Sequence, residues 1–473
     1  MKKALKRISS NIDLSLKKSD LSTRPGASNG LWIAFLLPTI FVVIACRARD
    51  LSYSLRFVGI ISSGLIGASA IFISNLATTE QNVRKFSALF YVPAVITSVL
   101  LLFLLKEGLL FCLTFGLGAT FSYFIGLPIL LGRFPNSFTF GEASVVAQAL
   151  VIFVLTSTVN LISSNNPQGL SDVEKVTVIL QVGLFGCGII ILCVSHLRLL
   201  RRGPAFYGTT LSVAFGFVVP LLHHLLQESP LRWIAQMIFL KPKAVILIVY
   251  WLCCCGVAIL VVNYQLSKQK SASTVVRKNF HYLIVAVYIP GIFTDCLLLY
   301  LSSGVILALF MMMETVRVLR VPPLADVLQN SVAIFVDEKD QGIVALTPIY
   351  LLVGCSLPLW VHPDCLLGTP RGFLLALAGV LSVGIGDTAA SVGGVRFGRH
   401  KWPGSKKSIE GTVISIFLQS LIVSGFAQFG FIPSSPSSLL RTFAAVTITS
   451  VLEALTDQVD NLVLPLVQLL LLL

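Results

Sequence analysis

Charged residues are what this chain has least of. Only 12% of its 473 residues are charged, whereas 55% are hydrophobic. The mean hydropathy is +0.88, and a soluble domain usually carries about a quarter charged residues. These values exclude a soluble globular protein and predict a polytopic membrane protein.

Other signals are absent as well. The first 30 residues lack the immediate apolar core of a cleavable signal peptide, so we expect the first apolar run to act as an uncleaved anchor. The ten cysteines fall largely inside apolar runs without metal-ligand or disulfide spacing, which predicts small hydrophobic side chains. The net charge of +14 comes from cations in short loops beside apolar runs. That pattern obeys the positive-inside rule and argues against a nucleic-acid partner.

Apolar runs long enough to span a bilayer recur along the whole chain. They lie near residues 31–48, 53–75, 86–105, 108–132, 142–162, 174–196, 204–226, 243–263, 281–300, 301–319, 343–361, 371–395, 411–432, 440–456 and 462–473. Since a transmembrane helix needs roughly 20 such residues, the sequence predicts an all-α polytopic integral membrane protein with about 13–15 transmembrane helices.

The composition changes near residue 266. We expect a basic cytosolic tail at 1–30, a multi-helical membrane region at 31–265 and a C-terminal catalytic membrane domain at 266–473. The apolar runs before residue 266 contain almost no charge, whereas several acidic residues lie in or at the ends of the later runs. Among them, Glu314 and Arg317 stand three residues apart and predict an ion pair at a helix end. Basic loops after even-numbered helices place the segment 386–412 on the cytosolic side.

The most informative residue of that segment is Asp387. In a helix starting there, Asp387, Ser391 and Gly394 share one face. A carboxylate and a hydroxyl one turn apart can hold Mg²⁺, which takes few protein ligands and keeps waters and substrate phosphates. The alternative is a helix N-cap, which needs only the carboxylate.

A basic, glycine-rich loop follows Asp387. Its cations are Arg396, Arg399, Lys401, Lys406 and Lys407, and its glycines are Gly393, Gly394, Gly398 and Gly404. Glycine-rich backbone combined with lysine is typical of a loop that binds phosphates. A Walker A sequence is absent, so a P-loop fold is not implied. The alternative is an ordinary cytosolic loop that obeys the positive-inside rule.

Acidic residues return near the C-terminal end. Glu453, Asp457 and Asp460 recur at helical spacing and predict an acidic stripe on one helix. Three carboxylates on one face repel one another unless something positive lies against them. A metal-bound nucleotide, or the pair Lys406 and Lys407, would serve.

Together these motifs resemble the dolichol kinase family. The resemblance rests on Gly386–Ser391, Trp402–Thr412 and Glu453–Leu466, and upstream on Arg277–His281, Tyr288–Gly291, Glu314–Arg317, Phe335–Gly342 and Leu346–Gly354. These blocks cover roughly residues 275–467, and the N-terminal half matches only in being multi-helical.

The resemblance implies a multi-pass enzyme of the endoplasmic reticulum membrane with its active site facing the cytosol. Such an enzyme transfers the γ-phosphate of CTP to the hydroxyl of dolichol, giving the dolichyl phosphate used in N-glycosylation and related mannosyl transfer. A divalent cation such as Mg²⁺ is implied. Dolichol, CTP and membrane lipid are the expected partners. The family's nucleotide loop corresponds to about Gly393–Lys407 of this chain.

From the motifs and the resemblance we expect the following site. The metal ligands are Asp387, Asp457 and Asp460. The nucleotide phosphates meet Gly393, Gly394, Gly398, Arg399, Lys401, Pro403, Gly404, Ser405, Lys406 and Lys407. Glu410 either orients Lys406 or Lys407 or takes the proton of the dolichol hydroxyl, with Asp457 and Asp460 as rivals for that role.

Three other functions remain open from the sequence. The segment Arg396–Lys401 is more basic than the family pattern and resembles CTP:phosphatidate cytidylyltransferases, which share the Asp, Lys-Lys and Glu-Gly arrangement and a terminal Asp-x-x-Asp. Phytol-type polyprenol kinases are a nearer neighbour. A transporter would require charges at mid-membrane depth and paired repeats, and the sequence has no matching repeat.

Overall fold

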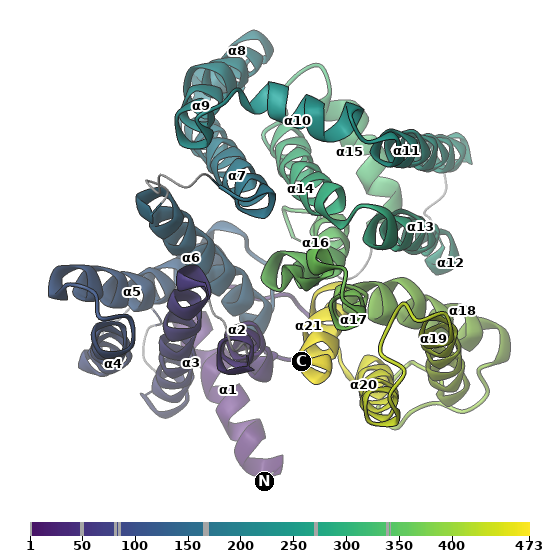
Figure 1. Ribbon diagram of the computed structural model, residues 1–473. Helices are drawn as coiled ribbons and strands as arrows, with labels where there is room; N and C mark the ends of the chain where they lie inside the picture. Colours follow the sequence, from purple (N-terminus) through teal and green to yellow (C-terminus); the bar gives the residue numbers. More distant parts are fainter. Residues whose placement is uncertain are drawn as a thin grey trace. The chain divides into compact units, whose positions relative to one another are not determined.

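A computed structural model describes residues 2–47, 52–79, 83, 87–163, 170–268, 273–336, 340 and 342–473. Across these ranges the chain is helical and forms no strand, apart from one isolated bridge between Lys401 and Ser408 (Figure 1). The predicted all-α class is confirmed. Asp337, Glu338, Lys339 and Gln341 of the family block at 335–342 lie outside the described residues.

The chain forms two compact units. One comprises residues 1–162 with 338–344 and the last residue, and the other comprises 163–337 and 345–472. The division after Ile162 differs from the change in composition near residue 266. Everything described below about the candidate active site lies within the second unit.

The first unit packs around aromatic side chains. Its helices are α1 (Lys2–Lys18), η1 (Leu31–Phe35), α2 (Leu36–Arg47), α3 (Tyr53–Thr79), η2 (Ala88–Phe90), α4 (Tyr91–Leu100), η3 (Leu101–Leu105), α5 (Leu109–Arg133) and α6 (Phe140–Ser163). The Phe72 ring stacks on Phe124 with centroids 5.7 Å apart. The predicted tail at 1–30 is folded onto this unit, because Ile12 of α1 is fully buried and Arg24 forms a buried ion pair with Glu142 at 2.7 Å.

The second unit contains the remaining helices. They are α7 (Asp172–His196), η4 (Arg198–Arg201), α8 (Gly203–Val213), η5 (Ala214–Val218), α9 (Val219–Leu226), α10 (Pro230–Phe239), α11 (Pro242–Lys268), α12 (Thr274–Arg277), α13 (Asn279–Thr294), α14 (Cys296–Val318), α15 (Ala325–Phe335), α16 (Thr347–Val361), η6 (Pro363–Leu367), α17 (Pro370–Ala376), η7 (Val380–Asp387), α18 (Thr388–Phe397), α19 (Ile409–Gln428), α20 (Pro436–Leu455) and α21 (Asp460–Leu472). The predicted pair Glu314–Arg317 is confirmed at 2.6 Å.

The described residues contain ten helices long and apolar enough to cross a membrane, or eleven if the segments 370–376 and 380–397, bent by 52°, count as one span. Four further apolar helices are shorter: Leu31–Arg47, Asn279–Thr294, Thr347–Val361 and Asp460–Leu472. The range of about 13–15 predicted from apolar runs includes these short helices. Run 281–300, for example, crosses a real break, because Asp295 caps α14 by accepting a hydrogen bond from Leu298 N–H at 3.0 Å.

The structure corrects the prediction made for the cysteines. Cys296 and Cys365 form a disulfide, with Cα atoms 6.3 Å apart. The prediction that all ten cysteines are unpaired small hydrophobic residues was therefore wrong. The two are separated by 69 residues, so local spacing carried no signal. They meet because the start of α14, which holds Cys296, contacts the η6 turn, which follows α16 and holds Cys365.

Candidate active site

Three carboxylates meet in the second unit. Ligand oxygens of Asp387, Glu453 and Asp460 all lie within 4.8 Å of one another, and all three residues are buried. Asp387 stands where the π-helical turn η7 joins α18, Glu453 lies in the last turn of α20, and Asp460 begins α21. π-Helical turns are often found at functional sites, where they displace a side chain from its regular α-helical position.

The predicted acidic stripe on one helix was wrong. Helix α20 ends at Leu455 and α21 begins only at Asp460, so Glu453, Asp457 and Asp460 do not share one helical face. The chain turns between the two helices and brings Glu453 against Asp460. Asp457 is exposed and accepts a hydrogen bond from Gln458 Nε2 at 2.7 Å. Of the three predicted metal ligands, the structure brings together Asp387 and Asp460, and Glu453 stands where Asp457 was expected.

The alternative role of Asp387 as a helix N-cap is also wrong. Its backbone is helical and its side chain caps no N–H of α18. The carboxylate instead contacts Lys278 Nζ and lies 3.3 Å from Nε2 of His281. Both partners come from the start of α13, and His281 Nε2 also lies 3.3 Å from Asn461 Oδ1. Sequence reasoning missed Lys278 and His281 as site residues, although both fall inside the quoted block Arg277–His281.

Lys407 is the second cation of the cluster. Its ammonium contacts the Glu453 carboxylate, donates to the Glu453 carbonyl at 2.7 Å, and lies 3.5 Å from Asp460 Oδ2. Burial alone would lower the pKa of Lys407, but the carboxylates of Asp460, Glu453 and Asp387 raise the pKa above its usual value. Lys407 therefore stays charged at neutral pH.

The donor set of this cluster fits a hard divalent cation. Three carboxylates face two ammonium groups, so the carboxylates outnumber the ammonium groups by one. A buried, unbalanced charge is costly, and a bound cation would relieve that cost. Mg²⁺ prefers carboxylate oxygens together with substrate phosphates. Asp387, Glu453 and Asp460 are thus the residues that fit Mg²⁺.

A short hairpin positions Lys407. Ser405 N–H donates to Trp402 C=O at 3.1 Å across a Pro-Gly turn in which Gly404 has φ +75°, as expected for a turn with glycine at its third position. Trp402 N–H donates to Lys407 C=O at 3.0 Å, and the Trp402 ring N–H donates to Thr412 Oγ1 at 3.0 Å.

The hairpin separates the two neighbouring lysines. The two side chains point in different directions, because Lys407 reaches the carboxylates whereas Lys406 is exposed. Arg399, Lys401, Pro403 and Gly404 are exposed as well, and Ser405 is half-buried. The structure therefore distinguishes the two lysines, which no feature of the sequence separates.

The predicted phosphate-loop glycines fall into two groups. A Cβ on Gly393 would lie 2.7 Å from Ile414 Cδ1, and one on Gly398 would lie 2.8 Å from Ser408 Cβ. Gly393 and Gly394 are inside α18, where their backbone N–H groups belong to the helix. These glycines let α18 pack closely on α19. Only Gly404 of the four is in open space.

Glu410 has a different partner from those expected. Its carboxylate lies 2.6 Å from His400 Nδ1 and accepts the His400 backbone N–H at 3.1 Å. The expectation that Glu410 orients Lys406 or Lys407 is not met by these contacts. They join the start of α19 to the start of the hairpin, which fixes the base of the loop.

Comparison with known proteins decides the family. A profile described as dolichol kinase matches residues 19–359. The chain belongs to the dolichol kinase family. It is 38% identical to mouse dolichol kinase over 363 residues, covering 73% of this chain and 66% of the relative, and 38% identical to the human dolichol kinase over 361 residues with the same coverage. A fission yeast relative, dolichol kinase sec59, is 29% identical over 353 residues. The chain thus spans just under two thirds of its mammalian relatives.

The extent of the match to the dolichol kinase family corrects one prediction. The matched residues begin at 19, so the expectation that the N-terminal half matches only in being multi-helical was wrong. The profile match includes Lys278 and His281 but ends before Asp387. Family membership and the carboxylate cluster are therefore two separate observations. No solved structure matches the chain.

Proposed function

We propose that this chain is a dolichol kinase that uses CTP as its phosphate donor. The observation that carries the proposal is the buried cluster of Asp387, Glu453 and Asp460 with Lys278 and Lys407, in a membrane protein of this family. Phosphoryl transfer depends on positioning and charge neutralisation more than on covalent chemistry. This cluster supplies both at the end of a helical bundle that borders lipid.

The residues then take the following roles. Bound Mg²⁺, held by Asp387, Glu453 and Asp460, would neutralise charge on the phosphate oxygens. Lys407 holds two of these carboxylates in place and would neutralise charge on the γ-phosphoryl group. The exposed cations Arg399, Lys401 and Lys406 raise the local concentration of the polyphosphate. Lys278 and His281 fix the Asp387 carboxylate.

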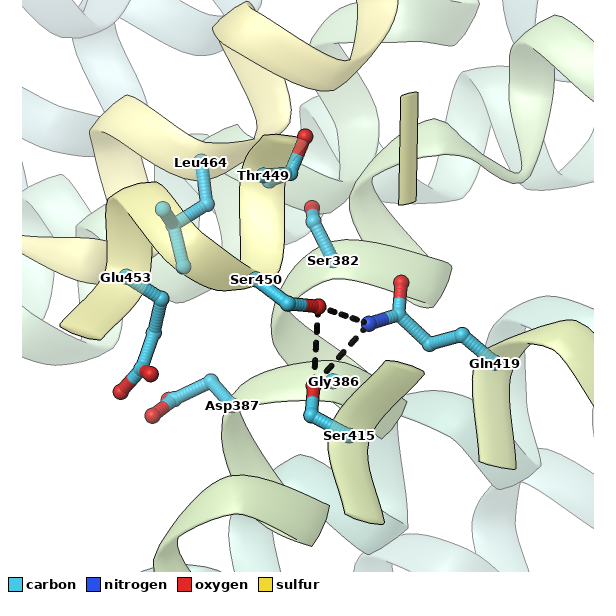
Figure 2. Close-up of a pocket in the computed structure, with 9 residues that line it drawn as sticks. All are labelled: Ser382, Gly386, Asp387, Ser415, Gln419, Thr449, Ser450, Glu453 and Leu464. Atoms are coloured by element: carbon cyan, nitrogen blue, oxygen red, sulfur yellow. Dashed lines mark hydrogen bonds between the residues drawn. The ribbon is translucent and has the colours of Figure 1, made fainter. Parts of the chain in front are cut away.

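The transfer itself balances as follows. The dolichol oxygen forms a bond to the γ-phosphorus while the bond from that phosphorus to CDP breaks. The hydroxyl proton passes to a carboxylate. Glu410 is hydrogen-bonded to His400, Asp457 is exposed, and Asp387 is paired with Lys278 and His281, so we assign the proton to Glu453, which borders the neighbouring pocket (Figure 2).

We place the enzyme in the endoplasmic reticulum membrane with this cluster facing the cytosol, where it would supply dolichyl phosphate for N-glycosylation. Support comes from the basic hairpin, since short cytosolic loops of membrane proteins are enriched in Lys and Arg. The hairpin carries Lys401, Lys406 and Lys407, and Lys407 contacts the cluster.

The proposal is tested with membranes that contain this chain, supplied with dolichol, Mg²⁺ and γ-labelled CTP. We expect the label in dolichyl phosphate, with ATP a poor donor. Membranes without the chain give the background. If the lipid stays unlabelled while α-labelled CTP places CMP on phosphatidate, the chain is a cytidylyltransferase instead.

A first prediction separates the two acidic residues that the sequence placed together. Glu453→Gln should raise the Mg²⁺ concentration needed for half-maximal activity by about tenfold or more, because it removes one carboxylate from the buried cluster. Asp457→Asn should leave that concentration unchanged, because Asp457 is exposed. The measurement is a Mg²⁺ titration of kinase activity in matched membranes. An equal rise for both variants would contradict the assignment of Glu453.

A further inference from the structure

Helix α10 (Pro230–Phe239) is a short helix between two long apolar segments. It follows the span Gly203–Leu226 and precedes α11, and Figure 1 shows it extending from α9 to α11. Ten residues of α-helix are about 15 Å long, which is about half the hydrocarbon thickness of a bilayer. Helix α10 therefore cannot cross the membrane. The spans before and after it reach the same face of the membrane, and α10 lies along that face.

Two neighbouring helices, α7 and α14, identify this face. They run in the same direction, because Thr177 Oγ1 lies 3.2 Å from the Tyr300 hydroxyl near their starts. Near their ends, Val194 and Val316 belong to one buried hydrophobic cluster. Helix α14 starts where α13 ends, and α13 starts at the carboxylate cluster beside Lys278. The 16 residues of α13 span about 24 Å, so the starts of α7 and α14 lie far from the carboxylates.

Helix α10 is attached at this distant end of α7. Lys175, near the start of α7, forms an ion pair with Glu228 at 2.5 Å. The Lys175 ammonium also lies 5.7 Å from the centre of the Trp233 ring in α10. Ser229 caps the N-terminus of α10. These contacts hold α10 on the face of the second unit that is opposite to Lys407 and the basic hairpin.

The side chains of α10 divide into three stripes around the helix. Trp233 and Met237 are buried against the protein, whereas Leu231 and Phe239 are 60% and 74% exposed. Arg232 is exposed as well and lies about 100° around the helix from Leu231. An exposed apolar stripe beside an exposed cation is typical of a helix that lies in the interface of a bilayer. Acyl chains would cover the apolar stripe and leave Arg232 among the headgroups.

Three cations without acidic partners gather at this helix. Arg232 and the two lysines that follow α10, Lys241 and Lys243, are all exposed. Within the described part of the chain none of the three forms an ion pair, and the nearby Glu228 is paired with Lys175. The positive-inside rule accounts for cations on one face of a membrane protein only, and the basic hairpin lies on the other face. These three cations therefore need another explanation.

We propose that α10 and the segment 240–243 form a binding surface for anionic phospholipids. Arg232, Lys241 and Lys243 contact the phosphate and the anionic headgroup, while the acyl chains lie over Leu231 and Phe239. The planar guanidinium of Arg232 matches the geometry of a phosphate, and each cation near an anionic leaflet is attracted to it. The inference does not depend on the kinase reaction, since none of these residues touches the carboxylate cluster.

The test uses the purified full chain in nanodiscs of phosphatidylcholine with a trace of photoreactive phosphatidylglycerol. A diazirine near the glycerol backbone of this lipid reports which residues border the headgroups, and the labelled peptides are mapped. We expect labels on residues 229–243 that unlabelled phosphatidylglycerol removes at least about tenfold more effectively than phosphatidylcholine does. Equal competition by the two lipids, or labels spread evenly over all exposed helices, would overturn the inference.

Two triple variants with the same change in charge complete the test. The variant Arg232→Gln, Lys241→Gln and Lys243→Gln should lose at least about nine tenths of the label on residues 229–243. Its melting temperature in pure phosphatidylcholine should equal that of wild type, which shows that it folds. The matched control removes three exposed arginines near the other ends of α7 and α14, by Arg198→Gln, Arg202→Gln and Arg320→Gln. It should be labelled at 229–243 like wild type. Full labelling of the first variant, or an equal loss in both, would overturn the inference.

Discussion

Asp387→Asn should lower dolichol phosphorylation about 100- to 1,000-fold while the chain still inserts into membranes. The substitution removes a carboxylate from the cluster that would hold the cation and oppose the phosphate charge, and electrostatic groups of this kind contribute on the order of 10²–10³ each. Asp387 is also the carboxylate held by Lys278 and His281. Turnover is measured with γ-labelled CTP and normalised to the amount of inserted protein.

The same substitution has a structural cost that the experiment must separate. Removing one partner of a buried ion pair destabilises a protein by about 3–5 kcal/mol, because the other charge is left unpaired. The double variant Asp387→Asn with Lys278→Met removes both charges. We expect its melting temperature in detergent to recover most of the loss of the single variant, while turnover stays absent. Recovery of turnover in the double variant would show that Asp387 acts through stability alone.

The second large effect concerns two adjacent lysines. Lys407→Met should lower turnover at least about 100-fold, because the variant loses the ammonium that contacts Glu453 and Asp460 and that, as proposed, opposes the phosphate charge. Lys406→Met should stay within about threefold of wild type, as expected for one exposed charge that only attracts the nucleotide. Initial rates at saturating and at limiting CTP separate the two effects, since Lys406→Met should act only at limiting CTP.

Each lysine variant controls for the other, because both remove the same charge and add the same side chain. Raising the ionic strength should weaken the contribution of Lys406 more than that of Lys407, since salt screens exposed charges much more than partly buried ones. Equal losses for the two variants at low salt and at high salt would contradict the roles assigned from the hairpin.

Much of the fold could be predicted because membrane helices leave a strong signal. Every apolar run of the sequence overlaps at least one helix of the structure. Asp387, Lys407 and Asp460 could be singled out because ionisable residues are rare in such a chain. The sequence could not predict that Glu453, rather than Asp457, joins the cluster. The segment from Thr456 to Val459 contains neither Gly nor Pro to mark the end of α20.

The contacts of Asp387 show why the rest of the site was missed. Lys278 is separated from it by 109 residues, and no periodicity relates the start of one helix to the junction of two others. Pattern identifies which elements form, whereas tertiary packing decides which polar groups meet.

The Cys296–Cys365 disulfide gives this bundle a chemical polarity. Helix α13 starts beside the carboxylate cluster and ends next to Cys296. Helix α16 starts at Thr347, whose carbonyl accepts a hydrogen bond from Asn461. It ends just before η6, which contains Cys365. Each helix is about 22–24 Å long. Disulfides persist in oxidising compartments, and cytosolic thiols are kept reduced. If the cluster faces the cytosol, as proposed, the disulfide would lie on the opposite, lumenal side. The orientation of the enzyme could then be read from which face of a sealed vesicle admits a membrane-impermeant reductant to this bond.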